Sequence, residues 1–69
     1  MKGRVAMDKK TVEFCGEIKR KTDKAYLIYD GDNEFWIPRS QIIDSTELKS
    51  LNMFEFTIPM WLAIEKEII

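Results

Sequence analysis

The sequence predicts a mainly β protein, namely a small antiparallel barrel of five strands with a C-terminal α-helix over about residues 59–68. Three observations lead to this prediction. Residues 22–43 have the pattern of two strands joined by a polar turn and followed by a proline-led corner. Residues 11–19 and 53–58 alternate apolar and polar side chains, which is the period of a half-buried strand. From Met60 onward the apolar residues recur at helical spacing.

The central hairpin is predicted from its turn. Residues 30–33, Asp-Gly-Asp-Asn, form a dense turn signal, because Gly and Asn tolerate positive φ and Asp bonds its own backbone. The strand before the turn carries apolar residues on both faces, since neighbouring side chains point to opposite sides. We expect the interior to form around Leu27, Phe35, Ile37 and Phe56. We expect the second face of the hairpin to carry Tyr26, Ile28 and Trp36.

The corner after the hairpin follows from Pro38, which cannot donate to a sheet ladder and should end its strand. Residues 39–42 then fit one helical turn that directs Ile42 or Ile43 to the core. The order aromatic–Ile–Pro–x–Ser–x–Ile over Trp36–Ile42 resembles the last corner of SH3-like barrels. We therefore expect an SH3- or OB-like barrel. The tandem tryptophans and acidic loop of proline-peptide-binding SH3 domains are absent, so that activity is not inferred.

The remaining segments complete the predicted barrel. Residues 1–10 are expected to be loose or to hold a short edge strand at 3–7. Gly16 interrupts an apolar strand face and indicates a bulge or bend. Residues 44–47 are turn-forming, 48–51 suggest a short strand and Asn52 a reversal. The last strand should turn Phe54, Phe56 and Ile58 inward. The C-terminal helix must dock on the barrel or on another chain. Its apolar stripe consists of Trp61, Ile64 or Glu65, and Ile68, with Leu62 and Ile69 beside it.

Composition excludes several classes of protein. The chain has 69 residues, enough for one domain over residues 1–69. Its net charge of −1 argues against a dedicated duplex-DNA binder, which needs a basic excess. One cysteine allows no internal disulfide, and no stretch suits a signal peptide or a membrane span. We therefore expect a cytoplasmic protein without membrane contact.

No pattern of residues indicates catalysis. Histidine is absent, which removes the commonest general base and metal ligand. Residues 30–34 are oxygen-rich, but their spacing does not match a calcium loop. Ser40 has no histidine partner, no glycine-rich phosphate loop occurs, and Cys15 is expected to be a buried, inert thiol. The prediction is a protein that is not an enzyme and has no cofactor and no metal site.

Three ordered blocks carry a resemblance to small uncharacterised phage and mobile-element proteins. These are Thr-Asp-Lys-Ala at 22–25, Trp-Ile-Pro-Arg-Ser-Gln-Ile at 36–42 and Ile-Pro-Met-Trp-Leu-Ala at 58–63. In the family they run T-D-K-A, W-I-P-K-S-Q-I and I-P-x-W-L-A, so Arg39 keeps the charge of the usual lysine. The chain ends in Glu-Lys-Glu-Ile-Ile where Lys-Gly-Leu is more typical. The resemblance implies an origin in a phage or mobile element, the cytoplasm of a bacterial or archaeal host as the location, and a compact accessory role, but no particular substrate.

Three functions remain open at this stage. The favoured one is an accessory module that binds a protein or nucleoprotein target, such as a host defence complex that it inhibits. Its anchors would be Tyr26, Trp36, Arg39 and Lys24. The alternative is single-stranded nucleic-acid binding, with bases stacked on Tyr26 and Trp36 and the backbone followed by Lys19, Arg20, Lys21 and Lys24. The third is a nucleotide sponge assembled from several copies. A homodimer is compatible with each of them.

Overall fold

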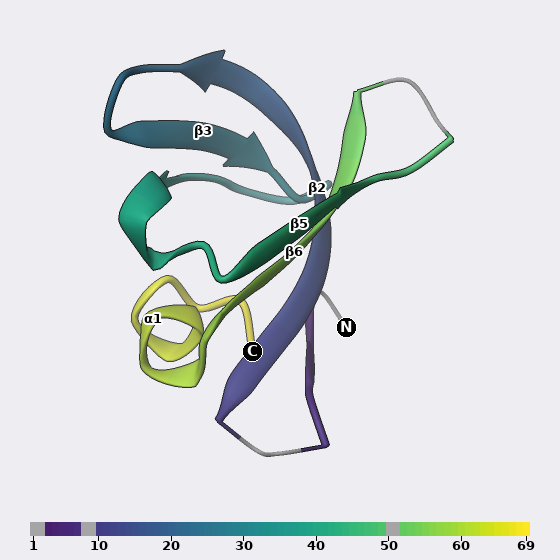
Figure 1. Ribbon diagram of the computed structural model, residues 1–69, viewed down its shortest axis with the longest axis vertical. Coiled ribbons are helices and arrows are strands. Elements are labelled where there is room, and N and C mark those ends of the chain that lie inside the picture. Colours follow the sequence, from purple (N-terminus) through teal and green to yellow (C-terminus); the bar gives the residue numbers. More distant parts are fainter. Residues whose placement is uncertain (1–2, 8–9, 50–51) are drawn as a thin grey trace.

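The computed structural model describes residues 3–7, 10–49 and 52–69. Within these ranges, six antiparallel strands form one unclosed sheet, and a short helix follows the last strand (Figure 1). The strands lie in the order β4-β3-β2-β6-β5, and β1 also pairs with β2. The bounds are β1 Gly3–Val5, β2 Thr11–Lys21, β3 Ala25–Tyr29, β4 Glu34–Pro38, β5 Asp44–Glu47, β6 Met53–Pro59, the 3₁₀ turn η1 Arg39–Gln41 and the helix α1 Met60–Glu65. The mainly β class and the C-terminal helix are confirmed, while the sheet has one strand more than expected and does not close.

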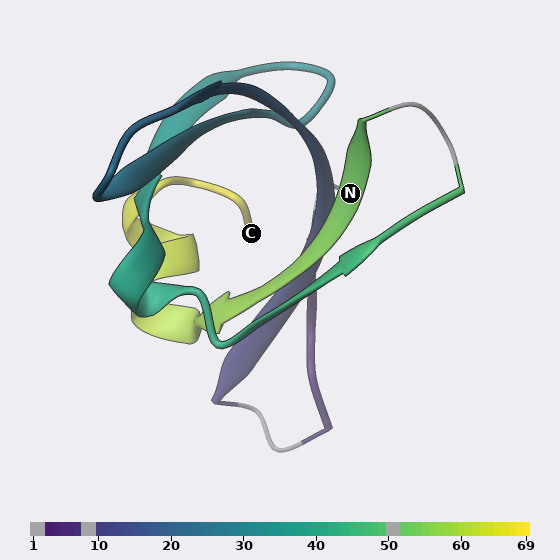
Figure 2. The same ribbon diagram turned by 45° about the horizontal axis from the view of Figure 1, so that its top comes forward.

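β2 is the strand that joins the two halves of the sheet. Its residue Glu17 pairs with Met53 of β6 on one edge and with Tyr29 of β3 on the other. β1 pairs with β2 at residues 12–14, on the edge that β3 uses farther along. Figures 1 and 2 show how strongly β2 curves between these pairings. One long bent strand therefore belongs to both the β6–β5 half and the β3–β4 half.

Gly16 lies in the middle of β2 and is needed for close packing. A Cβ at this position would lie 2.5 Å from Ile28 Cγ2 and 3.1 Å from the Tyr29 carbonyl oxygen. The register shift of β2 against β3 falls between Ile18 and Arg20, and not at the glycine. The predicted irregularity of β2 therefore exists, but it does not lie at Gly16. Gly16 makes room for Ile28, and the bulge lies a few residues farther along the strand, between Ile18 and Arg20.

The core forms between the sheet and the C-terminal segment. Its fully buried members are all apolar: Val12, Phe14, Ile28, Ile37, Phe56, Ile58, Leu62, Ala63 and Ile68. Ile37 and Phe56 are buried as expected, and Phe35 packs against the cluster. The expectation for Leu27 is wrong, because Ile28 is the buried residue of β3 and Leu27 is only half-buried. The reason is the register of the hairpin, which is described below.

The turn and the strand that were predicted before β6 lie at other positions than expected. The expected turn at residues 44–47 is the strand β5, whose four residues are all exposed. Leu48 and Lys49 lie outside any strand, and residues 50 and 51 of the expected 48–51 strand lie outside the described ranges. Asn52 does reverse the chain, with φ of 56°. Polar residues form β5 because β6 supplies the hydrogen-bonding partner, which no local preference indicates.

The helix docks by a different face from the one expected. Leu62 and Ala63 are buried, whereas Trp61 and Ile64 are 56% and 57% exposed. α1 leaves β6 directly through Pro59, whose extended backbone sets the direction of the helix. The helix is also shorter than 59–68, because Glu67 takes a φ of 59°. That turn returns Ile68 to the core, where its N–H donates to the Ala63 carbonyl at 2.8 Å. Figure 2 shows the C-terminal end lying inside the curve of the sheet.

Candidate partner-binding face

The β3–β4 hairpin places Tyr26 and Trp36 on opposite faces. Tyr26 pairs with Ile37, and Trp36 pairs with Leu27. Residues directly opposite each other in an antiparallel pair point to the same side. Tyr26 therefore lies on the core side with Ile37, and Trp36 lies on the outside with Leu27. The expected second face of Tyr26, Ile28 and Trp36 is wrong.

The turn explains this register. The Asp30 N–H donates to the Asn33 carbonyl at 3.1 Å, and the Asp30 carboxylate accepts from the N–H groups of Asp32 and Asn33 at 2.9 and 2.8 Å. A four-residue turn closed between positions 30 and 33 sets Ile28 opposite Phe35. A turn one residue longer or shorter would reverse the faces of β3.

The outside of the hairpin carries an apolar row with a cation at its end. Arg20 of β2 pairs with Leu27 of β3, which pairs with Trp36 of β4. Trp36 is 42% exposed, Leu27 is half-buried and Arg20 is exposed. We call the surface formed by Arg20, Leu27, Tyr29, Glu34 and Trp36 the Trp36 face. It lies on three hydrogen-bonded strands, so its side chains are held on a rigid support.

The next row of the Trp36 face adds a second aromatic ring and charges of both signs. Tyr29 pairs with Glu17 on one side and with Glu34 on the other. The Lys19 ammonium lies 5.5 Å from the centre of the Tyr29 ring and 3.6 Å from a Glu17 carboxylate oxygen. Leu27 and Tyr29 were not predicted from the sequence to belong to this surface. The sequence shows that Leu27 and Tyr29 share one face of their strand. It does not show that this face points outward, because that depends on the register set by the turn.

Arg39 and Tyr26 form a separate contact at the end of the hairpin. The Arg39 guanidinium lies 4.9 Å from the centre of the Tyr26 ring, and its Nη1 donates to the Thr22 carbonyl at 3.4 Å. The Arg39 backbone N–H donates to the Lys24 carbonyl at 2.8 Å. These contacts tie the corner after β4 to the turn between β2 and β3. Arg39 and Tyr26 therefore stabilise the fold locally, and Lys24 stays exposed in the turn.

The predicted basic strip gathers at one end of the molecule without forming one line. Lys19 and Arg20 lie at the bulge of β2, and Arg20 points to the Trp36 face. Lys21 pairs with Tyr26 and so has the opposite parity, and Lys24 lies beyond it in the turn. All four side chains are exposed. With Arg39 they concentrate positive charge at the β2–β3 end of a chain whose net charge is −1.

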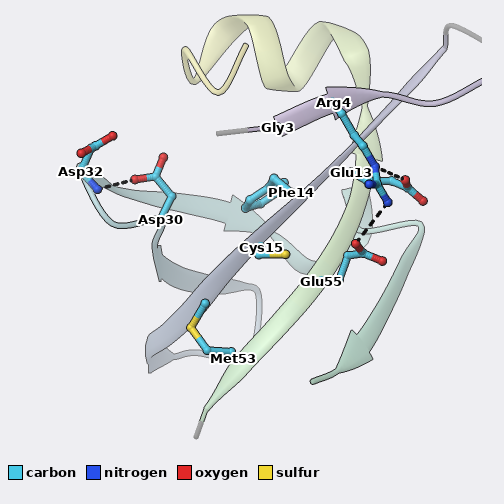
Figure 3. Close-up of a pocket in the computed structure, with 9 residues that line it drawn as sticks. All are labelled: Gly3, Arg4, Glu13, Phe14, Cys15, Asp30, Asp32, Met53 and Glu55. Carbon is cyan, nitrogen blue, oxygen red and sulfur yellow. Dashed lines mark hydrogen bonds and ion pairs between the residues drawn. The ribbon is translucent and has the colours of Figure 1, made fainter. Parts of the chain in front are cut away.

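A groove of about 470 Å³ lies elsewhere, lined by β1, β2, β6 and the turn that follows β3 (Figure 3). Its lining is Gly3, Arg4, Glu13, Phe14, Cys15, Asp30, Asp32, Met53 and Glu55. Arg4 lies between two carboxylates, at 3.0 Å from Glu13 and 3.5 Å from Glu55. Its hydrogen bond to Glu13, with the attraction of both carboxylates, raises the pKa of Arg4 above the ordinary value. Cys15 is a free, exposed thiol, so the prediction of a buried thiol is wrong.

Neither the groove nor the rest of the described chain shows a metal-binding group. No cluster of three or more His, Cys, Asp or Glu side chains in the described ranges is arranged to hold an ion. None of the helices within those ranges has the length and apolar character needed to cross a membrane. Comparisons with family models, with curated proteins and with solved structures found no match to this chain.

Proposed function

We propose that this chain is a non-enzymatic binding module that engages a protein or nucleoprotein partner through the Trp36 face. The observation that carries the proposal is the row Arg20–Leu27–Trp36, in which a large aromatic side chain stands 42% exposed on a rigid sheet. A contiguous apolar patch, as distinct from a single exposed apolar side chain, marks an interaction site, and Trp36 shares its face with Leu27 and Tyr29.

The composition of the Trp36 face supports a protein as the partner. Tryptophan, tyrosine and arginine are the residues that most often anchor protein interfaces, and charged residues form the rim around them. Here Trp36 and Leu27 form the apolar centre, while Arg20 and Glu34 supply opposite charges at the margin. The carboxylates of Glu17 and Glu34 on both sides of Tyr29 would repel a phosphate backbone laid across the same surface.

In this proposal the chain acts as an accessory protein of a phage or mobile element. It would occupy a surface of its target, such as a host defence complex, and inhibit that target by steric exclusion. Of the predicted anchors, Trp36 would contact the partner at the centre of the Trp36 face, and Lys24 would contact it from the β2–β3 turn. Tyr26 and Arg39 act indirectly, because their mutual contact fixes the corner that follows β4. An SH3-like arrangement of the sheet belongs to the same proposal, supported by the 3₁₀ turn that follows Pro38.

The decisive experiment compares two tryptophans in affinity capture from host-cell lysate. Trp36→Ala should lose the captured partner, because truncating a central anchor costs about 2 kcal/mol or more of binding free energy. Trp61→Ala is the matched control, since Trp61 is also exposed but lies on α1. Both variants should keep the wild-type circular dichroism spectrum. A folded Trp36→Ala variant that retains every partner would contradict the proposal.

Single-stranded nucleic-acid binding is a second candidate, favoured by the cations at the β2–β3 end. Lys19, Arg20, Lys21, Lys24 and Arg39 could follow a phosphate backbone while Trp36 stacks on a base. The predicted second stacking ring, Tyr26, lies on the core side, so the second ring would have to be Tyr29, which lies between Glu17 and Glu34. Titration with an oligothymidylate separates the two functions. Affinity that falls steeply with salt would favour the nucleic acid, whereas the proposed protein binder should be indifferent to the oligonucleotide.

A further inference from the structure

The outer edge of β4 is an open hydrogen-bonding edge, and the hairpin register shows which groups it exposes. Two backbone hydrogen bonds lie at the ends of the β3–β4 ladder: Asp30 N–H to Asn33 and Arg39 N–H to Lys24. Bonded and non-bonded pairs alternate along an antiparallel ladder. Phe35 and Ile37 therefore bond to β3. Glu34 and Trp36 direct their N–H and C=O groups away from it.

These outward groups belong to exposed residues. In the described ranges β4 pairs with β3 alone, and the side chains of Glu34 and Trp36 are both exposed. An uncovered strand edge is a template for another strand. Pro38 limits the template at one end, because it has no N–H to donate. The available edge is therefore short, and Trp36 lies at its centre.

We propose that a second copy of this chain docks antiparallel on the β4 edge, which gives a two-fold symmetric dimer with one continuous sheet. The register is set by the groups that need partners. If Glu34 of each copy pairs with Trp36 of the other, all the outward N–H and C=O groups of both residues are bonded. If Trp36 paired with its own equivalent, Glu34 would face Pro38, which would leave the Glu34 carbonyl without a donor.

The charges along the edge fit this antiparallel arrangement. One end carries the acidic residues Asp32 and Glu34, and the other carries Arg39, with Lys24 behind it in the β2–β3 turn. An antiparallel second copy brings the acidic end of one edge beside the basic end of the other. A parallel copy would set like charges together, which is unfavourable. The edge is thus complementary to itself, as a two-fold interface requires.

The dimer would enlarge the Trp36 face. The two Trp36 side chains would be diagonal neighbours, roughly 7–8 Å apart at the backbone, which is within reach of aromatic rings. The outer surface would then run without a break over the β2–β3–β4 strands of both copies. The dimer itself depends on the edge geometry, while its use as an enlarged binding surface rests on the proposed function.

The experiment compares two Glu→Pro substitutions by sedimentation over a range of protein concentrations. Glu34→Pro removes an outward N–H of β4 and should weaken dimerisation about tenfold or more, since each copy loses one hydrogen bond to the other. Glu47→Pro is the matched control on β5. Leu48 N–H donates to Met53 in the β5–β6 register, so Glu47 also directs its N–H outward. The Glu47→Pro variant should dimerise like the wild type, which we expect to associate in the micromolar range because the edge is short.

Hydrogen exchange gives a second measurement that does not depend on a variant. The amides of Glu34 and Trp36 should become protected as the protein concentration rises, while the amide of Glu47 should not. A wild type that stays monomeric, or a folded Glu34→Pro variant that dimerises normally, would overturn the dimer. The dimer would also be overturned if the wild type formed closed oligomers larger than a dimer and the Glu47→Pro substitution abolished them. That result would show that β4 pairs with β5 of the next copy. Monomers that still capture a partner through Trp36 would leave the proposed function intact.

Discussion

β4 and β5 are the strands at the two ends of the path β4-β3-β2-β6-β5, and they expose different chemistry. β5 consists of Asp44, Ser45, Thr46 and Glu47, which are all exposed and of which two are acidic. β4 carries Trp36 at its centre, 42% exposed, between inward-facing Phe35 and Ile37. Charged and polar residues discourage another strand from pairing with an edge. The β5 edge is therefore protected, and the β4 edge is suited to association.

The comparison also separates the two halves of the molecule that share β2. The β6–β5 half contributes Phe56 and Ile58 to the core and presents a polar edge. The β3–β4 half contributes Ile28 and Ile37 and presents the Trp36 face. A small domain can leave an aromatic residue exposed in one half because the other half and the C-terminal segment complete the core.

The largest expected effect on stability comes from a proline at position 35 of β4, next to the Glu34→Pro substitution described above. Phe35→Pro should destabilise the fold by about 3–5 kcal/mol, because it removes a ladder bond to β3 and a large core side chain. Phe35 packs on Phe14 with ring centres 5.8 Å apart. Urea unfolding followed by tryptophan fluorescence measures the loss. Phe35→Leu is the control that keeps the ladder bond, and an equal loss in both variants would refute the assigned alternation of β4.

A methyl group at the centre of β2 should have the next largest effect. Gly16→Ala should cost about 1–3 kcal/mol, because the new Cβ overlaps Ile28 where the two halves meet. Ile28→Ala removes the clashing methyl, so the double variant should lose less stability than the sum of the two single variants. Thermal unfolding of the four proteins gives this coupling, and strict additivity would contradict the close packing.

Exchanging the chemistry of the edges should shift association more modestly. Asp44→Val with Glu47→Val gives β5 an apolar, uncharged edge, and we expect it to self-associate about tenfold more strongly, which is about 1.4 kcal/mol. The pair should be introduced into the Glu34→Pro background, where β4 is blocked. Sedimentation measures the change. If the altered β5 stays monomeric, the acidic residues are not what protects this edge.

The smallest expected effect lies at the corner after β4. Arg39→Ala removes the contact with the Tyr26 ring and should lower stability by about 0.5–1 kcal/mol. Arg39→Lys keeps the charge and should recover part of this loss. Chemical unfolding resolves the difference, and the backbone amide of residue 39, which donates to the Lys24 carbonyl, should exchange faster in the alanine variant. Identical stability of the wild type and Arg39→Ala would show that the contact is merely geometric.

The elements that the sequence predicted correctly are those with strong local signals. The alternation of Val12 and Phe14, the turn at residues 30–33 and the stop at Pro38 each have a local physical cause, and each was found in its place. β5 was missed because three of its four residues, Asp44, Ser45 and Glu47, have little intrinsic preference for a strand. Half of the candidate site was misplaced for a different reason. Trp36 was identified, but Tyr26 was assigned to its face in place of Leu27 and Tyr29.

The amino-acid sequence by itself determined the mainly β class, the hairpin and its corner, and the helix after Pro59, because turn residues, proline and side-chain period act over a few neighbouring residues. Only the tertiary structure decided which face of β3 is buried, that polar residues 44–47 form an edge strand, and that Leu62 and Ala63 dock in place of Trp61 and Ile64. These outcomes depend on register and on the direction in which one element leaves another. A single bond across the turn, between Asp30 and Asn33, is compatible with the local sequence but fixes the surface of the whole hairpin.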